Sequence, residues 1–288
     1  MEIISADSRQ VYRGLNIGTA KPSIEEQREV PHHCIDICSP DQYFSAGEFA
    51  KLARGMIVKI HSGNRLPVVV GGSGMYIQAL VDGIFEGNYR DPVKRKQLRD
   101  RAHQEGWPAL YDELCRVDPE TAQTVHANDH KRIIRALEVY ALTGKAVSHI
   151  RRKETVPGQF QTVWFGLNWP RELLYGRIDL RVDRMIDSGL EAEVRRLLDL
   201  GYDRSLNSLD TVGYKEIIAF LNQEILFDEA VNRIKKNTRR FAKRQLSWFR
   251  RDSRINWLNM EAEEGMDQHI RTVISKLQSL DTALGFIV

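Results

Sequence analysis

One stretch near the beginning of the chain, EIISADSRQVYRGLNIGTAKP at residues 2–22, constrains the fold more than any other. Its first four residues, 2–5, are typical of a short buried strand, and a glycine-containing loop follows them. Asp7 and Ser8 therefore come at the carboxyl end of that strand. Ligands bind at this end of the strands in open parallel α/β sheets, so an acid there is a candidate chemical group. Capping of the next helical turn by Asp7 is the alternative.

A second strand-to-turn segment is LPVVVGGSGMY at residues 66–76. The apolar run at 66–70 predicts a strand that is buried on both faces of a parallel sheet. The turn at residues 71–74 follows it directly. Glycines in such a turn let the backbone approach a phosphate, and the N-terminus of the next helix favours anions. Tight packing against another element would need the same glycines, so both interpretations remain open.

The rest of the chain has the pattern of an α/β core with a helical insertion. Residues 31–37 and 162–167 are strand-like, and we expect the second of these to rejoin the first sheet. Ser45 and Glu48 form a capping box for a helix that ends near Gly63. Further helices are predicted at 170–188, 228–250 and 267–280, with a strand at 255–258.

Between about residues 83 and 156, strand-like runs are replaced by amphipathic helical segments at 93–105, 108–117 and 131–142. We therefore expect two domains. Residues 1–82 and 157–288 would form the α/β core domain, and residues 83–156 would form an all-helical insertion domain.

Basic residues are concentrated in one later segment, although the formal net charge is only +3. Between Arg233 and Arg254 there are ten Lys or Arg residues and a single acid, Asp252. At 100° per residue, the helix predicted at 228–250 has an apolar stripe and a cationic stripe. This local excess is the electrostatic footprint of a polyanionic partner. A solvated helix face is the alternative.

The composition is that of a globular protein, with 42% hydrophobic residues in a chain long enough to bury a sizeable core. No apolar run of about 18 residues and no hydrophobic signal segment occurs, so we expect a cytoplasmic protein without a membrane span. Cys34, Cys38 and Cys115 lack the spacing of a zinc site. We identify no metal ligands in the chain itself.

Three motifs together closely resemble those of the tRNA dimethylallyltransferases: ISADSRQVYRGLNIGTAKP from residue 4, PHHCIDI from residue 31 and VGGSGMY from residue 70. Further matches continue to Trp257, so the resemblance covers nearly the whole chain. The resemblance implies transfer of an isopentenyl-type group to an adenine next to the anticodon. It also implies a P-loop NTPase-like parallel sheet flanked by helices, with the helical insertion carried on that core.

The chain departs from this family at one point. The family has a phosphate-binding loop, GxxxxGK[ST], upstream of the strand that carries Asp7, and no such string occurs here. We therefore expect Met1 to be an artificial or misassigned start, or the start of a truncated gene. We also expect Ile3, Ile4 and residues 68–70 to lack a neighbouring strand. Unpaired backbone and exposed apolar area would then lower stability and favour aggregation.

The implied chemistry needs a base and an anion site. The exocyclic amine of adenine is a poor nucleophile, so attack on an allylic carbon benefits from a carboxylate that accepts its proton. The resemblance assigns that role to Asp7, and Ser73 and Arg181 are the other catalytic candidates. Mg²⁺ is the expected cofactor, and the diphosphate would be bound by Arg181, Gly72 and Ser73. A structural ion pair of Arg181 with Asp179 or Asp183 is the competing explanation.

Recognition of the RNA is a separate requirement, because the target adenine must be splayed from its loop into a channel. By resemblance, the tRNA anticodon stem-loop contacts segments spread over the whole chain. Packing in the core is the alternative for the single tryptophan among them. The predicted contact residues are Asp7, Ser8, Arg9, Gln10, Arg95, Lys131, Arg132, Ile133, Ile134, Arg135, Asp210, Thr211, Val212, Gly213, Tyr214, Lys215, Lys243, Arg244, Gln245, Leu246, Ser247, Trp248, Phe249 and Arg250.

The leading hypothesis is a monomeric tRNA dimethylallyltransferase that transfers a dimethylallyl group from dimethylallyl diphosphate to N6 of adenine 37. One alternative is an RNA-binding remnant that holds tRNA but lacks turnover without the phosphate loop. A second alternative is an isopentenyltransferase that acts on free adenine nucleotides. The basic helix argues against the second alternative, because a free nucleotide needs no extended cationic face.

Overall fold

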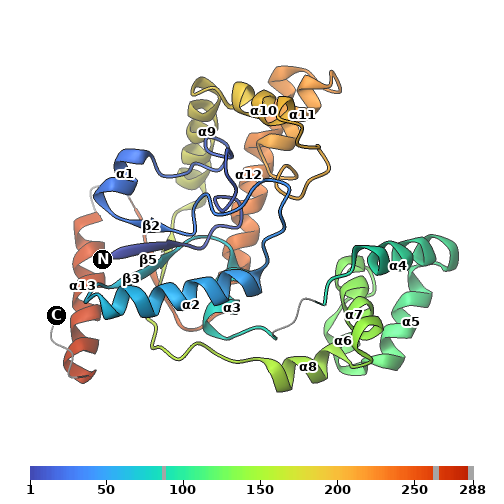
Figure 1. Ribbon diagram of the computed structural model, residues 1–288. Helices are drawn as coiled ribbons and strands as arrows, with labels where there is room; N and C mark the ends of the chain where they lie inside the picture. The colour runs from blue at the N-terminus through green and yellow to red at the C-terminus, as the bar shows by residue number, and fades with distance from the viewer. Residues whose placement is uncertain (86–88, 262–265, 285–288) are drawn as a thin grey trace. The chain divides into compact units, whose positions relative to one another are not determined.

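The computed structural model describes residues 1–85, 89–261 and 266–284, and it divides into two compact units (Figure 1). Residues 1–77 and 159–288 belong to the first unit, and residues 78–158 form the second. We call them the α/β unit and the helical unit. No helix among the described residues is long and apolar enough to cross a membrane.

A parallel three-stranded sheet with the order β2-β1-β3 forms the first part of the α/β unit. The strands are β1 (Glu2–Ser5), β2 (His32–His33) and β3 (Pro67–Val70). Ile3 pairs with His32 on one side and with Val68 on the other. The short strand β1 is therefore central in this sheet, and the side chain of Ile4 is completely buried.

This sheet corrects three expectations. Strand β1 has a partner on each side, so the prediction that Ile3 and Ile4 lack a neighbour is wrong. The strand predicted at 31–37 has only two residues, because Cys34 and Asp36 have φ angles of 64° and 55° and turn the chain. Strand β3 is not buried on both faces. Val70 is 51% exposed, since β3 pairs only with β1 within the described residues.

Helix α2 (Ala46–Ser62) packs on β1 and β3. The capping box predicted for its start is confirmed: the Glu48 N–H donates to Ser45 Oγ at 3.1 Å, and the Ser45 N–H donates to Glu48 Oε2 at 2.6 Å. Phe49 and Ala53 are fully buried and give the helix its apolar face. Two shorter helices, α1 (Ile24–Glu29) and α3 (Gly74–Val81), belong to the same half of the chain, and α3 begins directly after the glycine turn.

The strand predicted at 162–167 does not rejoin that sheet in the described residues. It forms β4 (Trp164–Asn168), whose ladder of backbone pairs goes to β5 (Ile255–Asn259). The two strands make a separate two-stranded parallel sheet. The expectation of a single sheet is therefore wrong, because the pairing that decides it joins segments far apart in sequence.

The second half of the α/β unit is mainly helical. Its helices are α9 (Arg171–Asp187), α10 (Leu190–Asp199), α11 (Tyr214–Leu221), α12 (Phe227–Phe249) and α13 (Met266–Leu284). Helices α9 and α12 lie side by side (Figure 1). Two ion pairs join them, Arg239 with Asp179 at 2.8 Å and Lys235 with Asp183 at 2.6 Å. Helices α10 and α11 are short and were not predicted from the sequence.

The helical unit confirms the three predicted helices and adds two. It contains α4 (Pro92–Glu105), α5 (Trp107–Val117), α6 (Pro119–Thr124), α7 (His130–Thr143) and α8 (Val147–Glu154). Helix α7 begins where Asp129 accepts the N–H of Arg132 at 3.2 Å, and it ends at Gly144, whose φ is 67°. Its buried face, with Ile133 and Leu137, packs in the core of the unit.

Candidate active site

Asp7 lies just beyond the carboxyl end of β1 and is half-buried. Its Oδ1 accepts the N–H groups of Arg9 at 2.7 Å and Gln10 at 3.4 Å. Asp7 therefore does cap the following turn, as the capping alternative proposes, but it uses one oxygen to do so. Within the described residues, Oδ2 receives no hydrogen bond. That oxygen is free to accept a proton.

The turn after β3 lies against the Asp7 segment. The Ser73 N–H donates to the carbonyl of Ala6 at 3.1 Å, and the Ser8 N–H donates to Ser73 Oγ at 2.9 Å. A Cβ on Gly71 would collide with the main chain of Ala6, so glycine is required there. Because adjacent parallel strands end at the same edge of a sheet, Asp7 and the Ser73 hydroxyl meet at one place.

The other glycines of this turn contact helix α12. Gln245 Nε2 donates to the carbonyl of Gly72 at 3.1 Å. Added Cβ atoms on Gly72 and Gly74 would collide with the side chains of Gln245 and Trp248, respectively. These contacts support the tight-packing interpretation of both glycines and a packing role for Trp248. A contact between Gly72 and a diphosphate stays a prediction.

Arg181, the predicted diphosphate ligand, lies on α9. Its two candidate structural partners are occupied, since Asp179 pairs with Arg239 and Asp183 pairs with Lys235. Arg181 itself forms no hydrogen bond or ion pair in the part of the chain that the structure describes. Removal of water lowers the pKa of its guanidinium, and the negative charge of Asp7 acts in the opposite direction. Arg181 is thus within electrostatic range of Asp7 and unpaired.

Two of the predicted RNA-contacting side chains beside Asp7 already bind the protein. Arg9 Nη1 donates to the carbonyl of Asn207 at 2.5 Å. Gln10 Nε2 donates to the carbonyls of Thr19 and Ala20, each at 3.2 Å, and its Oε1 accepts the Ser5 hydroxyl at 2.9 Å. These contacts order the loop after β1. They also mean that Gln10 has a structural role that its sequence position did not reveal.

Some predicted RNA contacts are side chains of the core. Tyr214 and Ile133 are completely buried, and Ile134 is 4% exposed. Thr211 and Gly213 are buried as well. The side chains of these residues are therefore not accessible to RNA, and only their main-chain atoms could contact it. Asp210 and Lys215 are exposed and pair with each other at 3.1 Å.

Helix α12 presents exposed cations. Lys243 and Arg240 make no ion pair within the described residues, and Arg244 lies over the ring of Phe241, 5.7 Å from its centroid. Arg250 Nη2 donates to the side-chain oxygen of Asn168 at 3.3 Å. Ser247 is exposed, whereas Leu246 and Phe249 are half-buried. The helix therefore carries positive charge that a polyanion can neutralise.

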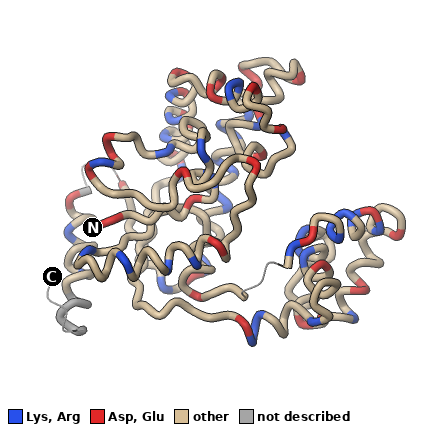
Figure 2. Tube along the Cα trace, in the orientation of Figure 1, with Lys and Arg blue, Asp and Glu red and all other residues tan. Residues whose placement is uncertain are grey.

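The cations of the helical unit are arranged differently. Glu138 is completely buried, and it accepts Arg95 Nη2 at 2.7 Å, Arg135 Nη1 at 3.0 Å and the Asp91 N–H at 3.0 Å. Burial raises the pKa of this carboxyl, but these bonds outweigh burial and lower it overall. Arg132 pairs with Asp129 at 3.4 Å. Basic and acidic residues accordingly alternate along this unit (Figure 2).

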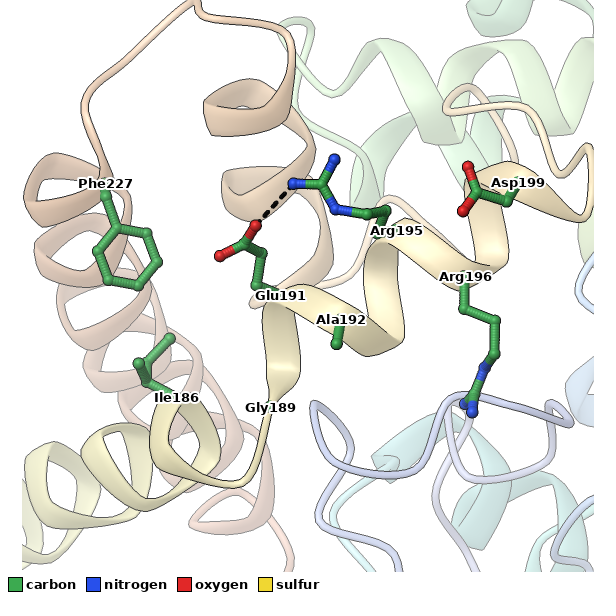
Figure 3. A pocket seen from close by; sticks show the side chains of 8 residues that line it. All are labelled: Ile186, Gly189, Glu191, Ala192, Arg195, Arg196, Asp199 and Phe227. Atoms are coloured by element: carbon green, nitrogen blue, oxygen red, sulfur yellow. Dashed lines mark hydrogen bonds and ion pairs between the residues drawn. The ribbon is translucent and has the colours of Figure 1, made fainter.

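A surface pocket lies away from these residues. It is lined by Ile186, Gly189, Glu191, Ala192, Arg195, Arg196, Asp199 and Phe227, from α9, α10 and α12 (Figure 3). Arg195 Nη2 donates to Glu191 Oε1 at 2.7 Å across it. None of the candidate residues lines this pocket, so the pocket and the candidate site are separate.

The model of the IPP transferase family matches residues 10–252. The chain belongs to this family. A tRNA dimethylallyltransferase of Pelotomaculum thermopropionicum is 47% identical over 90% of this chain and 83% of its own length. Another, from Carboxydothermus hydrogenoformans, is 46% identical over 96% of this chain and 88% of its own.

Solved structures agree with this assignment to the IPP transferases. The full-length tRNA isopentenylpyrophosphate transferase from Bacillus halodurans is 38% identical, with a TM-score of 0.71 over 99% of this chain and 90% of its own. A eukaryotic dimethylallyltransferase acting on tRNA is 26% identical, with a TM-score of 0.81 over 100% of this chain and 74% of its own. The predicted α/β fold and the predicted family are therefore confirmed.

In this IPP transferase, sequence reasoning missed one group beside the site. Glu193, on α10, is 4% exposed and binds the loop after β1. A signal for it exists, because Leu190, Val194 and Leu197 are apolar and lie on the same helix face as Glu193. An acid on the apolar stripe of a helix indicates a buried charge with partners elsewhere in the chain.

Proposed function

We propose that this chain is a tRNA dimethylallyltransferase that transfers a dimethylallyl group from dimethylallyl diphosphate to N6 of adenine 37. Two observations carry the proposal: one Asp7 oxygen receives no hydrogen bond within the described residues, and Arg181, which has no partner there, is within electrostatic range of Asp7. A base and an unneutralised cation within electrostatic range of each other are what proton removal and departure of an anion require. Family membership supports the substrate class.

The proposed reaction has one bond-forming step. The N6 lone pair of adenine attacks the allylic carbon of the donor, and the bond between that carbon and the diphosphate oxygen breaks. The N6 proton passes to Asp7 Oδ2, and the diphosphate leaves with the bonding electron pair. Arg181 stabilises the negative charge that develops on the leaving group, and Ser73 supplies a hydroxyl to it.

We propose Mg²⁺ as a cofactor that binds together with the diphosphate. Among the described residues, no group of three or more His, Cys, Asp or Glu side chains is placed to hold a metal ion. We propose that Mg²⁺ instead arrives bound to the diphosphate and keeps several of its waters, which is how it commonly binds with phosphate substrates. When bound, Mg²⁺ would neutralise charge on the diphosphate. Ser73 is the neutral side-chain oxygen of this chain that could face it.

The proposed RNA partner is the tRNA anticodon stem-loop. Support comes from the exposed cations of α12, which lie on the same helix as the Gln245 contact to the glycine turn. Phosphate contacts from such cations position an RNA, and the base itself is read after it leaves the stack. We further propose that the helical unit contacts the stem, and that the protein acts as a cytoplasmic monomer.

Transfer of labelled dimethylallyl from its diphosphate to an anticodon stem-loop tests the proposal, with RNA binding measured beside it. We expect the wild-type chain to transfer the label. Asp7→Ala should lower the single-turnover rate by about 100- to 10,000-fold, the usual range for loss of a general base, without weakening RNA binding equally. The matched control is Asp41→Ala, an exposed aspartate of the same unit. If the wild type binds the RNA but transfers no label, the proposed transferase activity is contradicted and the RNA-binding alternative is favoured.

A further inference from the structure

Glu193 is a buried acid whose hydrogen-bond partners are backbone amides and a hydroxyl. Its Oε2 accepts the N–H groups of Asn16 at 3.1 Å and Ile17 at 2.9 Å, and its Oε1 accepts the N–H of Gly18 at 3.3 Å. The Tyr214 hydroxyl donates to Oε1 at 2.6 Å. No Lys or Arg in the described ranges forms an ion pair with it. Its charge is therefore held by three successive backbone amides and one hydroxyl.

The residues around Glu193 fit closely against the loop that it binds. A Cβ on Gly18 would collide with the ring of Tyr214, so glycine lets the ring close over the loop. Tyr214 is completely buried, and burial together with the Glu193 charge raises the pKa of its hydroxyl. The hydroxyl thus stays protonated and remains a donor. Two helices, α10 and α11, consequently hold the same three loop amides in place.

The same loop connects Glu193 to the turn that holds Asp7. Directly after the amides bound by Glu193 come the carbonyls of Thr19 and Ala20, which accept both bonds from Gln10 Nε2. The Gln10 N–H is in turn one of the two donors to Asp7 Oδ1. Hydrogen bonds, linked by the covalent chain of the loop and of Gln10, therefore lead from Tyr214 and Glu193 to the capped oxygen of Asp7.

We propose that Glu193 is a positioning residue, which fixes the loop at residues 16–20 and through Gln10 directs the free oxygen of Asp7 toward the target adenine. This inference rests on the proposed function, because it names the group that aims the proposed base. Tyr214 belongs to the segment at 210–215 that was predicted to contact RNA, so the same contact ties that segment to Asp7. A misplacement of about 1 Å at a reacting group can cost 100-fold in rate.

Glu193→Gln tests this proposal, since it keeps the size of the side chain but replaces one acceptor oxygen by a donor. The control is Glu191→Gln on the same helix, where the side chain is 40% exposed and pairs with Arg195. We expect Glu193→Gln to lower the single-turnover rate at saturating RNA and donor by about 10- to 100-fold. The RNA Kd should change less than about threefold, and Glu191→Gln should match the wild type.

A merely structural residue would instead lower the melting temperature and leave the rate of the folded enzyme unchanged. All rates are therefore measured well below the melting temperature of each variant. If Glu193→Gln does not fold, Tyr214→Phe carries the test. It removes one donor and keeps the three amides, so a rate reduction of about fivefold is expected. A rate equal to that of Glu191→Gln for either folded variant would overturn the proposal.

Hydrogen exchange separates failure of this inference from failure of the proposed function. If the wild type transfers no label, the proposed function fails, and exchange then decides only whether Glu193 stabilises the turn that holds Asp7. Faster exchange of backbone amides at residues 7–10 in Glu193→Gln than in Glu191→Gln supports it. Faster exchange confined to residues 16–18 means that Glu193 does not act on Asp7, and the inference is wrong.

Discussion

Helix α12 and helix α7 both carry cations, but particular cations on the two helices are placed differently. On α12, Lys243 and Arg240 are exposed and have no acidic partner within the described residues. On α7, Arg135 shares the buried Glu138 with Arg95 of α4. Lys243 and Arg240 therefore face solvent, whereas Arg135 and Arg95 hold a buried acid.

This difference shows that a count of Lys and Arg residues does not identify a polyanion-binding face. A cation that is paired with a buried acid is held in one geometry, and its charge is largely neutralised. An exposed, unpaired cation keeps its charge for a phosphate. Arg95 and Arg135 should therefore matter for the stability of the helical unit, whereas Lys243 and Arg240 should matter for RNA binding.

The largest effect is expected from Glu138→Gln. The substitution leaves Arg95 and Arg135 without their shared buried partner, and loss of one member of such a group typically costs about 3–5 kcal/mol of stability. Hydrogen exchange over residues 133–139 measures the local unfolding of the helical unit. Glu105→Gln is the control, because its pair with Arg101 is exposed and should contribute less than about 1 kcal/mol. Equal exchange rates in the two variants would contradict the claim that the cations bound by Glu138 stabilise the helical unit.

A smaller effect is expected on lowering the pH. Asp118 is 2% exposed, and it accepts bonds from the N–H and hydroxyl groups of both Thr121 and Ser148. Burial raises the pKa of its carboxyl, but these bonds outweigh burial and lower it overall. Because the folded pKa lies below the unfolded value, the stabilisation is present above about pH 3.9 and is lost as pH falls through the folded pKa.

Asp118→Asn removes this titration. The variant should be less stable than the wild type by about 1–3 kcal/mol at neutral pH, and the difference should shrink below about pH 4. Hydrogen exchange of the helical unit at several pH values measures both quantities. A difference that is independent of pH would show that the Asp118 charge does not contribute.

The smallest effect tests whether the exposed cations of α12 bind RNA phosphates. Lys243→Gln should weaken binding of an anticodon stem-loop modestly and lower the slope of log K against log salt by about 0.7–0.9 for one lost phosphate contact. Arg135→Gln should leave that slope unchanged, provided that the variant remains folded. Binding titrations at four or more salt concentrations measure the slopes. A larger slope change for Arg135→Gln would reverse the assignment of the two helices.

Local signals in the sequence predicted the elements that local chemistry determines. The capping box at Ser45 and the apolar run before Gly71 both mark real boundaries. The strand after Pro31 could not be bounded, because nothing in its sequence indicates the positive φ of Cys34 and Asp36.

Contacts between distant segments escaped prediction. Glu193 binds Ile17 across 176 residues, and Ser8 binds the Ser73 hydroxyl across 65. The pairing of β4 with β5 also joins segments distant in sequence, and the sequence alone could not distinguish it from pairing with β3. Asp7, Ser73 and Arg181 were proposed through resemblance. The structure brings the first two together and frees the third from its neighbours, whereas their chemical roles stay predictions.

The most direct test of the site is the single-turnover rate of dimethylallyl transfer to an anticodon stem-loop by Arg181→Ala, beside Arg184→Ala. Both residues are arginines of α9, and the negative charge of Asp7 acts to raise the pKa of Arg181 against the effect of burial. If Arg181 binds the diphosphate, its loss should reduce the rate at subsaturating donor by about 10- to 100-fold, the value of one or two charge-assisted hydrogen bonds. Arg184→Ala should stay within about twofold of the wild type. Equal rates for the two variants would contradict the assignment of the reaction to this edge of the sheet.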